Sequence, residues 1–215
     1  MKRMQNRAKR SRAPWLLCLL LPLGWATAHA GGGPFGIDYE WTLDQRGIWA
    51  RSYQLGLRDA AIAATGFGAL WLGNDDPVGH EFWQSIDAEL VSGAGAEVLK
   101  YAFSRARPFQ GNDPNEWFQG HGDESFPSGE VTLQASFVAP FVFDNVRAHP
   151  WVVALEILPV YDAIARMKSQ AHWQSDVLAS WLLGTGVGYW TTTLPVPLTV
   201  RLLPRGLSIG LDRRF

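Results

Sequence analysis

The sequence predicts an all-α protein, built as a single-domain helical bundle. Apolar residues recur every three or four positions, the spacing of one helix face, in six segments: 53–72, 82–90, 95–106, 131–143, 151–167 and 172–190. The tail after Pro204 instead alternates apolar with polar or small residues, as one short strand would. No internal repeat interrupts this pattern, so residues 31–215 are expected to form one helical domain.

Glycine, proline and polar residues mark the boundaries of these helices. Residues 31–36 are a Gly-rich start, and residues 109–126 form a long loop rich in Gly, Asn, Asp and Glu. Pro108 is expected to end the segment 95–106, with Arg107 at the helix end, because the residue before a proline is pushed out of the α region. A turn near Ser169 and Gln170 is expected to separate the last two segments.

Residues 1–30 are predicted to be a signal peptide. A cluster of Lys and Arg precedes the apolar run 15–23, and Ala28-His29-Ala30 matches the small-x-small cleavage rule. An uncleaved membrane anchor is the alternative, but the run is short for a span of ~20 residues. The single cysteine, Cys18, lies in this segment, so residues 31–215 contain neither a disulfide nor a thiol nucleophile. The expected location is the periplasm or the cell exterior.

Cleavage after Ala30 would leave an acidic protein of 185 residues. The leader holds six of the 19 Lys and Arg residues and none of the 20 Asp and Glu residues, so the remainder has a net charge of −7. A negative surface argues against a nucleic-acid partner and does not attract anionic lipid. Any affinity for phosphate must then come from a local cationic pocket.

Three stretches far apart in the chain carry groups that could bind and cleave a phosphate ester. They are Lys100 with Arg107-Pro108, Pro127-Ser128-Gly129, and Arg166 with His172 and Asp176. Together they supply three cations for phosphoryl oxygens, a hydroxyl, a backbone N–H, and an imidazole with a carboxylate. This set favours an enzyme.

The spacings fit helices that border a site. Lys100 and Arg107 are seven residues apart, so we expect them on one helical face, two turns apart. His172 and Asp176 are four apart, which would let the carboxylate accept the Nδ1–H and leave Nε2 as the nucleophile.

Each stretch also has a structural explanation when taken alone. His172 could be a packed core histidine, and the cations Lys100, Arg105 and Arg107 could be the solvated end of a helix. Ser128 could serve only as the N-cap of the helix that follows. The coincidence of all three stretches favours function.

The three motifs, K-x6-R-P, P-S-G and R-x5-H-x3-D, resemble in order and spacing those of the type 2 phosphatidic-acid phosphatase and vanadium haloperoxidase superfamily, over about residues 98–180. The resemblance implies a helical bundle of the acid phosphatase type. It also implies that His172 attacks phosphorus to form a phosphohistidine and that Asp176 orients it, with no metal or other cofactor. The phosphoryl oxygens would be bound by five residues: Lys100, Arg107, Ser128, Gly129 through its N–H, and Arg166.

Two positions depart from the family pattern. Motif three begins with Ala165 where the family usually has Ser, and motif two continues with Glu130 where the family has a His that resembles a general acid. Glu130 could act as that acid only when protonated; burial would raise its pKa and the neighbouring cations would lower it. Three outcomes stay open: an acidic optimum, a substrate such as a diphosphate whose leaving group needs no proton, or a non-catalytic phosphate binder. His121 could substitute as the acid.

The expected function is hydrolysis of a phosphomonoester or diphosphate, on a small molecule or a lipid, without nucleic acid as a partner. The alternatives are a vanadate-dependent haloperoxidase and a non-catalytic phosphate or lipid-phosphate binding protein. The uncharged stretch 177–200 is long enough to span a membrane. Its threonines, its two prolines and the near-zero mean hydropathy of the chain favour a soluble or peripherally membrane-associated bundle.

Overall fold

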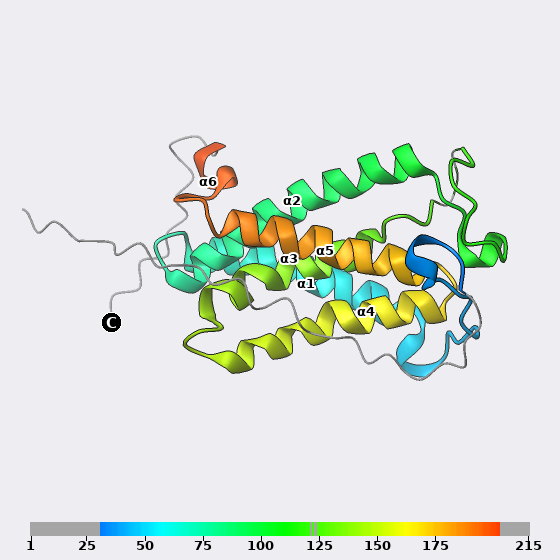
Figure 1. Ribbon diagram of the computed structural model, residues 1–215. Coiled ribbons are helices and arrows are strands. Elements are labelled where there is room, and N and C mark those ends of the chain that lie inside the picture. Colours follow the sequence, from blue (N-terminus) through cyan, green and yellow to red (C-terminus); the bar gives the residue numbers. More distant parts are fainter. Residues whose placement is uncertain (1–30, 121, 123, 203–215) are drawn as a thin grey trace, which may run out of the picture. The chain divides into compact units, whose positions relative to one another are not determined.

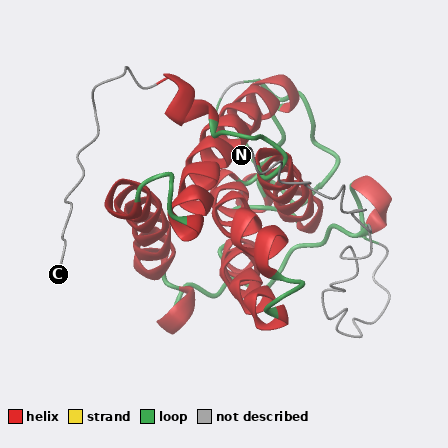
Figure 2. Ribbon diagram, turned by 90° about the vertical axis from the view of Figure 1, so that its left-hand side faces the viewer, coloured by secondary structure: helices red, strands yellow, loops and turns green. Residues whose placement is uncertain are grey.

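The structure is a computed structural model that describes residues 31–120, 122 and 124–202 (Figure 1). Six α-helices lie in this part of the chain: α1 (Arg51–Leu72), α2 (Pro77–Phe103), α3 (Gly129–Asn145), α4 (Ile157–Lys168), α5 (Gln174–Thr191) and α6 (Leu198–Leu202). Four 3₁₀ helices accompany them: η1 (Pro34–Gly36), η2 (Gly47–Trp49), η3 (Pro108–Gln110) and η4 (Pro150–Glu156). Among these residues the only β pairing is an isolated bridge between Gly32 and Asp38, which confirms the all-α prediction (Figure 2).

The helix that carries Lys100 begins earlier and ends earlier than the sequence predicts. Segments 82–90 and 95–106 form one continuous helix, α2, which ends at Phe103. Ser104 has a left-handed backbone (φ 38°), and its N–H caps the carbonyl of Lys100, so the helix stops before Pro108. The expectation that Lys100 and Arg107 share a helical face is therefore wrong, because Arg107 lies in the loop and Pro108 begins η3.

The centre of the bundle is a close contact between α3 and α5, with α2 and α4 beside α3. A Cβ atom on Gly184 of α5 would lie 2.4 Å from the carbonyl oxygen of Thr132, and one on Gly188 would lie 2.5 Å from Cβ of Ala139. Glycine at both positions lets the two backbones approach. This contact holds the start of α3 beside the start of α5.

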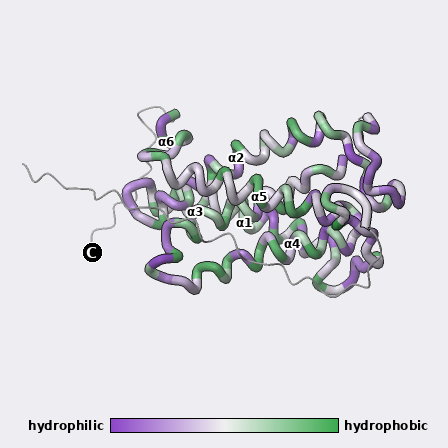
Figure 3. The backbone as a smooth tube through the Cα atoms, in the orientation of Figure 1, coloured by the Kyte–Doolittle hydropathy of each residue, from purple (hydrophilic) through white to green (hydrophobic). Residues whose placement is uncertain are grey.

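Successive long helices run in opposite directions, so five helix ends gather at one end of the bundle (Figure 1). These ends are the beginnings of α1, α3 and α5 and the last turns of α2 and α4. The long loop 104–128 lies at the same end and is mostly hydrophilic (Figure 3). All three motif stretches fall at this end.

In the described part of the chain, no helix combines the length and the apolar character needed to cross a membrane. The uncharged stretch 177–200 is divided between α5 and α6 by a turn at residues 192–197. The predicted leader, the tail strand after Pro204 and His121 lie outside the described residues.

Candidate phosphate-binding active site

The structure brings the three motif stretches together around His172. The positive charges of Arg166, Arg107 and Lys100 all act on this imidazole and, after burial, are the main reasons why its pKa is lowered well below the usual value. Motif one also meets motif two directly, because Lys100 Nζ lies 3.3 Å from where a Cβ on Gly129 would stand. All three cations expected from the sequence therefore lie close enough to His172 to lower its pKa.

The backbone of the loop orients His172. Its Nδ1 lies 2.6 Å from the carbonyl oxygen of Ser125, and the side chain is buried. A carbonyl can only accept, so Nδ1 carries the proton and Nε2 keeps the lone pair. With its pKa lowered, the ring is neutral near pH 7, which is the form a nucleophile requires.

The expected bond between Asp176 and His172 is wrong. His172 lies in the turn before α5 rather than on the helix, so the four-residue helical spacing does not apply. Asp176 instead accepts from the N–H of Trp173 (2.9 Å), from Ser125 Oγ (2.5 Å) and from Arg105. It therefore acts on His172 through Ser125.

Arg105 is buried and ion-paired, and it does not lie at the solvated end of a helix. Its side chain is fully buried, donates to Asp38 (2.6 Å) and Asp176, and lies 4.3 Å from the ring centre of Trp117. Asp38 in turn accepts from the N–H and hydroxyl of Ser175. This ion-paired cluster joins the segment before α1, through Asp38, and the loop 104–128, through Arg105, to the start of α5.

Ser128 occupies the N-cap position of α3, but its side chain makes no cap bond. Its N–H donates to Ser180 Oγ (2.6 Å), and its carbonyl accepts from Thr132. The Oγ is buried and has no hydrogen-bond partner among the residues that the structure describes. A buried hydroxyl without a hydrogen-bond partner costs free energy unless a ligand binds it. An N-cap role alone therefore does not explain Ser128.

Arg166 comes from the last turn of α4, and the turn expected after it is confirmed at Ser169 and Gln170. Its Nη1 donates to Gln54 Oε1 at 3.1 Å, and its buried Nε has no partner in the described part of the chain. Together with Ser128 Oγ, this nitrogen is a second buried donor that a phosphoryl oxygen would satisfy.

Lys100 and Arg107 complete the cationic set. Lys100 Nζ bonds Glu97 one turn earlier on α2 at 2.6 Å, and Arg107 Nη2 donates to the carbonyl of Glu124 at 3.2 Å. Lys100 supplies a compact charge, and Arg107 supplies a planar fork of donors.

Glu130 does not stand alone among these cations. Both of its oxygens are bonded by Arg51 at the start of α1, with 2.7 Å between Oε2 and Nη1, and Arg166 Nη1 lies 4.0 Å away. Burial acts to raise the pKa of Glu130, but the bond from Arg51 and the charge of Arg166 outweigh it, and the pKa is lowered. Glu130 is thus ionised near pH 7 and holds no proton for a leaving group.

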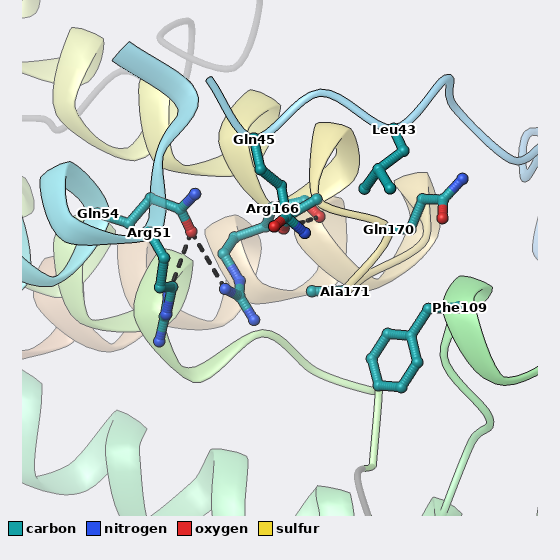
Figure 4. Close-up of a pocket in the computed structure, with 9 residues that line it drawn as sticks. Leu43, Gln45, Arg51, Gln54, Phe109, Arg166, Gln170 and Ala171 are labelled. Atoms are coloured by element: carbon teal, nitrogen blue, oxygen red, sulfur yellow. Dashed lines mark hydrogen bonds between the residues drawn. The ribbon is translucent and has the colours of Figure 1, made fainter. Parts of the chain in front are cut away.

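A cavity of about 310 Å³ opens beside Arg166 (Figure 4). Arg51 and Arg166 reach into it side by side, and the buried Gln54 lies between them with Oε1 3.1 Å from Nη1 of each. Leu43 and Phe109 form part of its apolar wall. His172 does not line the cavity, but its neighbour Ala171 does.

Asp162 lies one helical turn before Arg166 on α4. It is buried, and neither carboxylate oxygen has a hydrogen-bond partner within residues 31–120, 122 and 124–202. Burial and the negative charge of Glu130 raise its pKa to about 7, against the positive charges of Arg166 and Arg51.

In the described part of the chain, no three His, Cys, Asp or Glu side chains gather in a way that could hold a metal ion. The charged side chains that act on His172 are those of Arg166, Arg107 and Lys100.

A family model described as the PAP2 superfamily matches residues 83–199, more than half of the chain and all three motifs. The chain belongs to the PAP2 superfamily. This membership confirms the family resemblance and agrees with the helical fold. No solved structure matches the chain.

Curated relatives of this PAP2 chain carry names of lipid-phosphate enzymes. It is 36% identical over 112 residues to a lipid A 1-phosphatase of Rhizobium johnstonii, covering 49% of this chain and 42% of that protein. A lipid A 1-phosphatase of Rhizobium etli is likewise 36% identical over 112 residues, covering 49% and 44%. An undecaprenyl-diphosphatase of Sulfolobus acidocaldarius is 28% identical over 95 residues, covering 43% and 45%. The matches thus span less than half the length of these relatives.

Several residues of the site were not predicted from the sequence. Arg51, Gln54 and Asp38 precede the motif region and have no spacing that links them to it. Ser125 and Asp162 lie close to motif residues, yet their roles depend on loop and helix packing. The one usable signal was Glu130 in motif two, because a carboxylate beside a phosphate site needs a cation to compensate its charge, and Arg51 is that cation.

Proposed function

We propose that this PAP2 protein is a phosphatase that hydrolyses a phosphomonoester or diphosphate carried by a lipid, through a phosphohistidine at His172. The observation that carries the proposal is the orientation of His172. Its Nδ1–H is held by the Ser125 carbonyl and its ring is neutral, so the Nε2 lone pair is available beside three cations.

In the first step Nε2 bonds to phosphorus while the bond from phosphorus to the leaving oxygen breaks, and that oxygen keeps the electron pair. Lys100, Arg107 and Arg166 would offset the charge on the phosphoryl oxygens. Ser128 Oγ and Arg166 Nε, which lack partners, would donate to them. The Nδ1–H bond to Ser125 stabilises the positive charge that develops on the ring.

In the second step a water oxygen bonds to phosphorus, and Nε2 recovers its electron pair. Inorganic phosphate leaves, and one proton of the water passes to solvent. No metal takes part in either step of this proposal. The names of the relatives support a lipid or isoprenoid substrate, and the apolar cavity wall of Leu43 and Phe109 would suit its hydrocarbon part.

The proposed location is the periplasm or the cell exterior, with peripheral contact to a membrane that supplies the lipid. Leader cleavage after Ala30 and release of the protein from membranes by alkaline or high-salt washing are the results expected. Retention in washed membranes would contradict the peripheral location.

The test of activity is phosphate release by the full chain and by His172→Ala, on an aryl phosphate and on a lipid phosphate, with a chelator present. Trapping of an acid-labile phosphoryl group on the wild type but not on His172→Ala would establish the intermediate. A non-catalytic phosphate binder is the second candidate, because the ionised Glu130 cannot donate a proton. Phosphate binding without turnover in both proteins would favour it.

A further inference from the structure

Two guanidinium groups stand at the wall of the cavity, although the family motifs account for only one of them. Arg166 belongs to motif three, whereas Arg51 is on α1, before the matched residues 83–199. Gln54 Oε1 accepts from Nη1 of both at 3.1 Å, so these two nitrogens lie no farther apart than twice that distance, about 6 Å. Two adjacent phosphoryl groups can span this separation.

The position of Arg51 is built into the fold. Gln54 is buried, and its Nε2 anchors it to the carbonyl of Trp49 at 2.9 Å. Glu130 bonds two nitrogens of Arg51, which fixes the plane of the guanidinium and offsets its charge. The side chain of Arg51 lines the cavity and is still 44% exposed, and a guanidinium has five N–H donors, of which three are used by Gln54 and Glu130, so it can bind a further anion.

Among the residues that the structure describes, those lining the cavity are poorly suited to protonate a leaving oxygen. They include no Asp, Glu, His, Lys, Tyr or Cys side chain; the polar side chains are two Arg, three Gln and Ser169. An alkoxide expelled into such a cavity would leave as a strong base. A phosphate monoester expelled from a diphosphate is already a stable anion and needs cations rather than a proton.

We infer that Arg51 is a specificity-determining residue, held by Gln54 and Glu130, that receives the second phosphate of a diphosphate substrate. The inference deepens the proposed function and rests on it for the chemical step. His172 Nε2 bonds to the terminal phosphorus as its bond to the bridging oxygen breaks, and the departing monophosphate keeps the electron pair beside Arg51. Glu130 then fixes Arg51, and the positive charge of Arg51 offsets the repulsion between Glu130 and phosphate.

Binding tests this role without turnover when His172 is replaced. Inorganic pyrophosphate and inorganic phosphate are titrated into the full chain with His172→Ala and into the same protein with Arg51→Gln or Arg58→Gln added, with calorimetry as the readout. Arg58 is the matched control because it lies two turns further along α1, pairs with Asp59 and does not line the cavity. His172→Ala alone and the Arg58→Gln control should bind pyrophosphate at least ~10-fold more tightly than phosphate, and the protein with Arg51→Gln should lose that preference. Equal binding of the two anions by His172→Ala alone would overturn the inference.

Cleavage adds a second readout with farnesyl diphosphate and farnesyl monophosphate, which share one hydrocarbon tail. Arg51→Gln should lower kcat/KM for the diphosphate by about 10- to 100-fold and for the monophosphate by less than ~3-fold. Arg51→Lys keeps the charge and loses the planar set of guanidinium donors, so its kcat/KM for the diphosphate should lie between those of wild type and Arg51→Gln. It also replaces Arg51→Gln as the test variant if that protein does not fold. Equal losses on both substrates would contradict the inference. Turnover that survives in His172→Ala would instead contradict the proposed function, and the binding result would still decide the role of Arg51.

Discussion

Ser125 orients His172: its carbonyl oxygen lies 2.6 Å from Nδ1 of the imidazole, while its hydroxyl donates to Asp176. The carboxylate of motif three is thus linked to His172 through a loop residue and is itself ion-paired with Arg105. This indirect link replaces the direct contact suggested by the four-residue spacing, and we expect Asp176 to contribute to both stability and activity.

Ser125→Ala keeps the carbonyl and removes the hydroxyl, so we expect kcat to fall about 10-fold with KM within ~2-fold. Asp176→Asn leaves Arg105 with one carboxylate fewer and should also lower the free energy of unfolding by about 3 kcal/mol. Steady-state kinetics and denaturant unfolding of both variants measure these effects. A large loss of kcat in Asp176→Asn at unchanged stability would show instead that Asp176 contacts His172 in the working enzyme.

Glu130 should not set the pH dependence of turnover. Its pKa is lowered by Arg51 and Arg166, so Glu130→Gln is expected to change the rate without moving the limb of the pH profile on which the rate falls as the pH rises. Glu130→His should restore a proton donor and raise kcat on phosphomonoesters near pH 7 by about 10- to 100-fold. The profiles of kcat against pH decide the matter, and disappearance in Glu130→Gln of the limb on which kcat falls as the pH rises would identify Glu130 as a proton donor.

Asp162 should make stability depend on pH. Its pKa rises from 3.8 to about 7 on folding, so its contribution to stability is fully present below pH 3.8 and is lost as the pH rises through 7. Asp162→Asn does not titrate, so its stability relative to wild type should increase by about 1–3 kcal/mol between pH 4.5 and 8 and then level off. Urea unfolding at several pH values measures the difference. A difference that is constant with pH would contradict the raised pKa.

The contact between α3 and α5 can be tested with two glycines of one helix. Gly184→Ala would place a Cβ 2.4 Å from the Thr132 carbonyl oxygen, and we expect a loss of about 1–3 kcal/mol. Gly186→Ala, where nothing lies within 4 Å, should stabilise the protein by about 0.5–1 kcal/mol because alanine is the better helix former. Similar effects of both substitutions on thermal unfolding would mean that the helices do not pack at Gly184.

Much of the fold was predictable because local signals are strong. Apolar spacing placed a helix within each of the five long helices, although it divided α2 into two segments and included the 3₁₀ helix η4 in the segment 151–167. The three motifs in order identified the family and predicted that Lys100, Arg107, Arg166 and His172 contribute to one site. The end of α2 was misplaced because a left-handed Ser104, which no spacing reveals, stops the helix before Pro108 acts.

The parts of the site that were not predictable depend on tertiary contacts. Arg51 meets Glu130 across 79 residues, and Asp38 meets Arg105 across 67. Neither pair leaves a periodic trace in the sequence. The acid–base state of Glu130 was left open for the same reason: it depends on Arg51, whose position follows only from packing of α1 against α3.

The most direct test of the central claim is phosphate release from a lipid phosphate by the full chain and by His172→Ala, at pH 7 with a chelator present. The account predicts turnover by the wild type and a loss of at least about 10³-fold in kcat for His172→Ala, with unchanged thermal stability showing that the variant is folded. Equal phosphate release by the two folded proteins would contradict nucleophilic catalysis by His172.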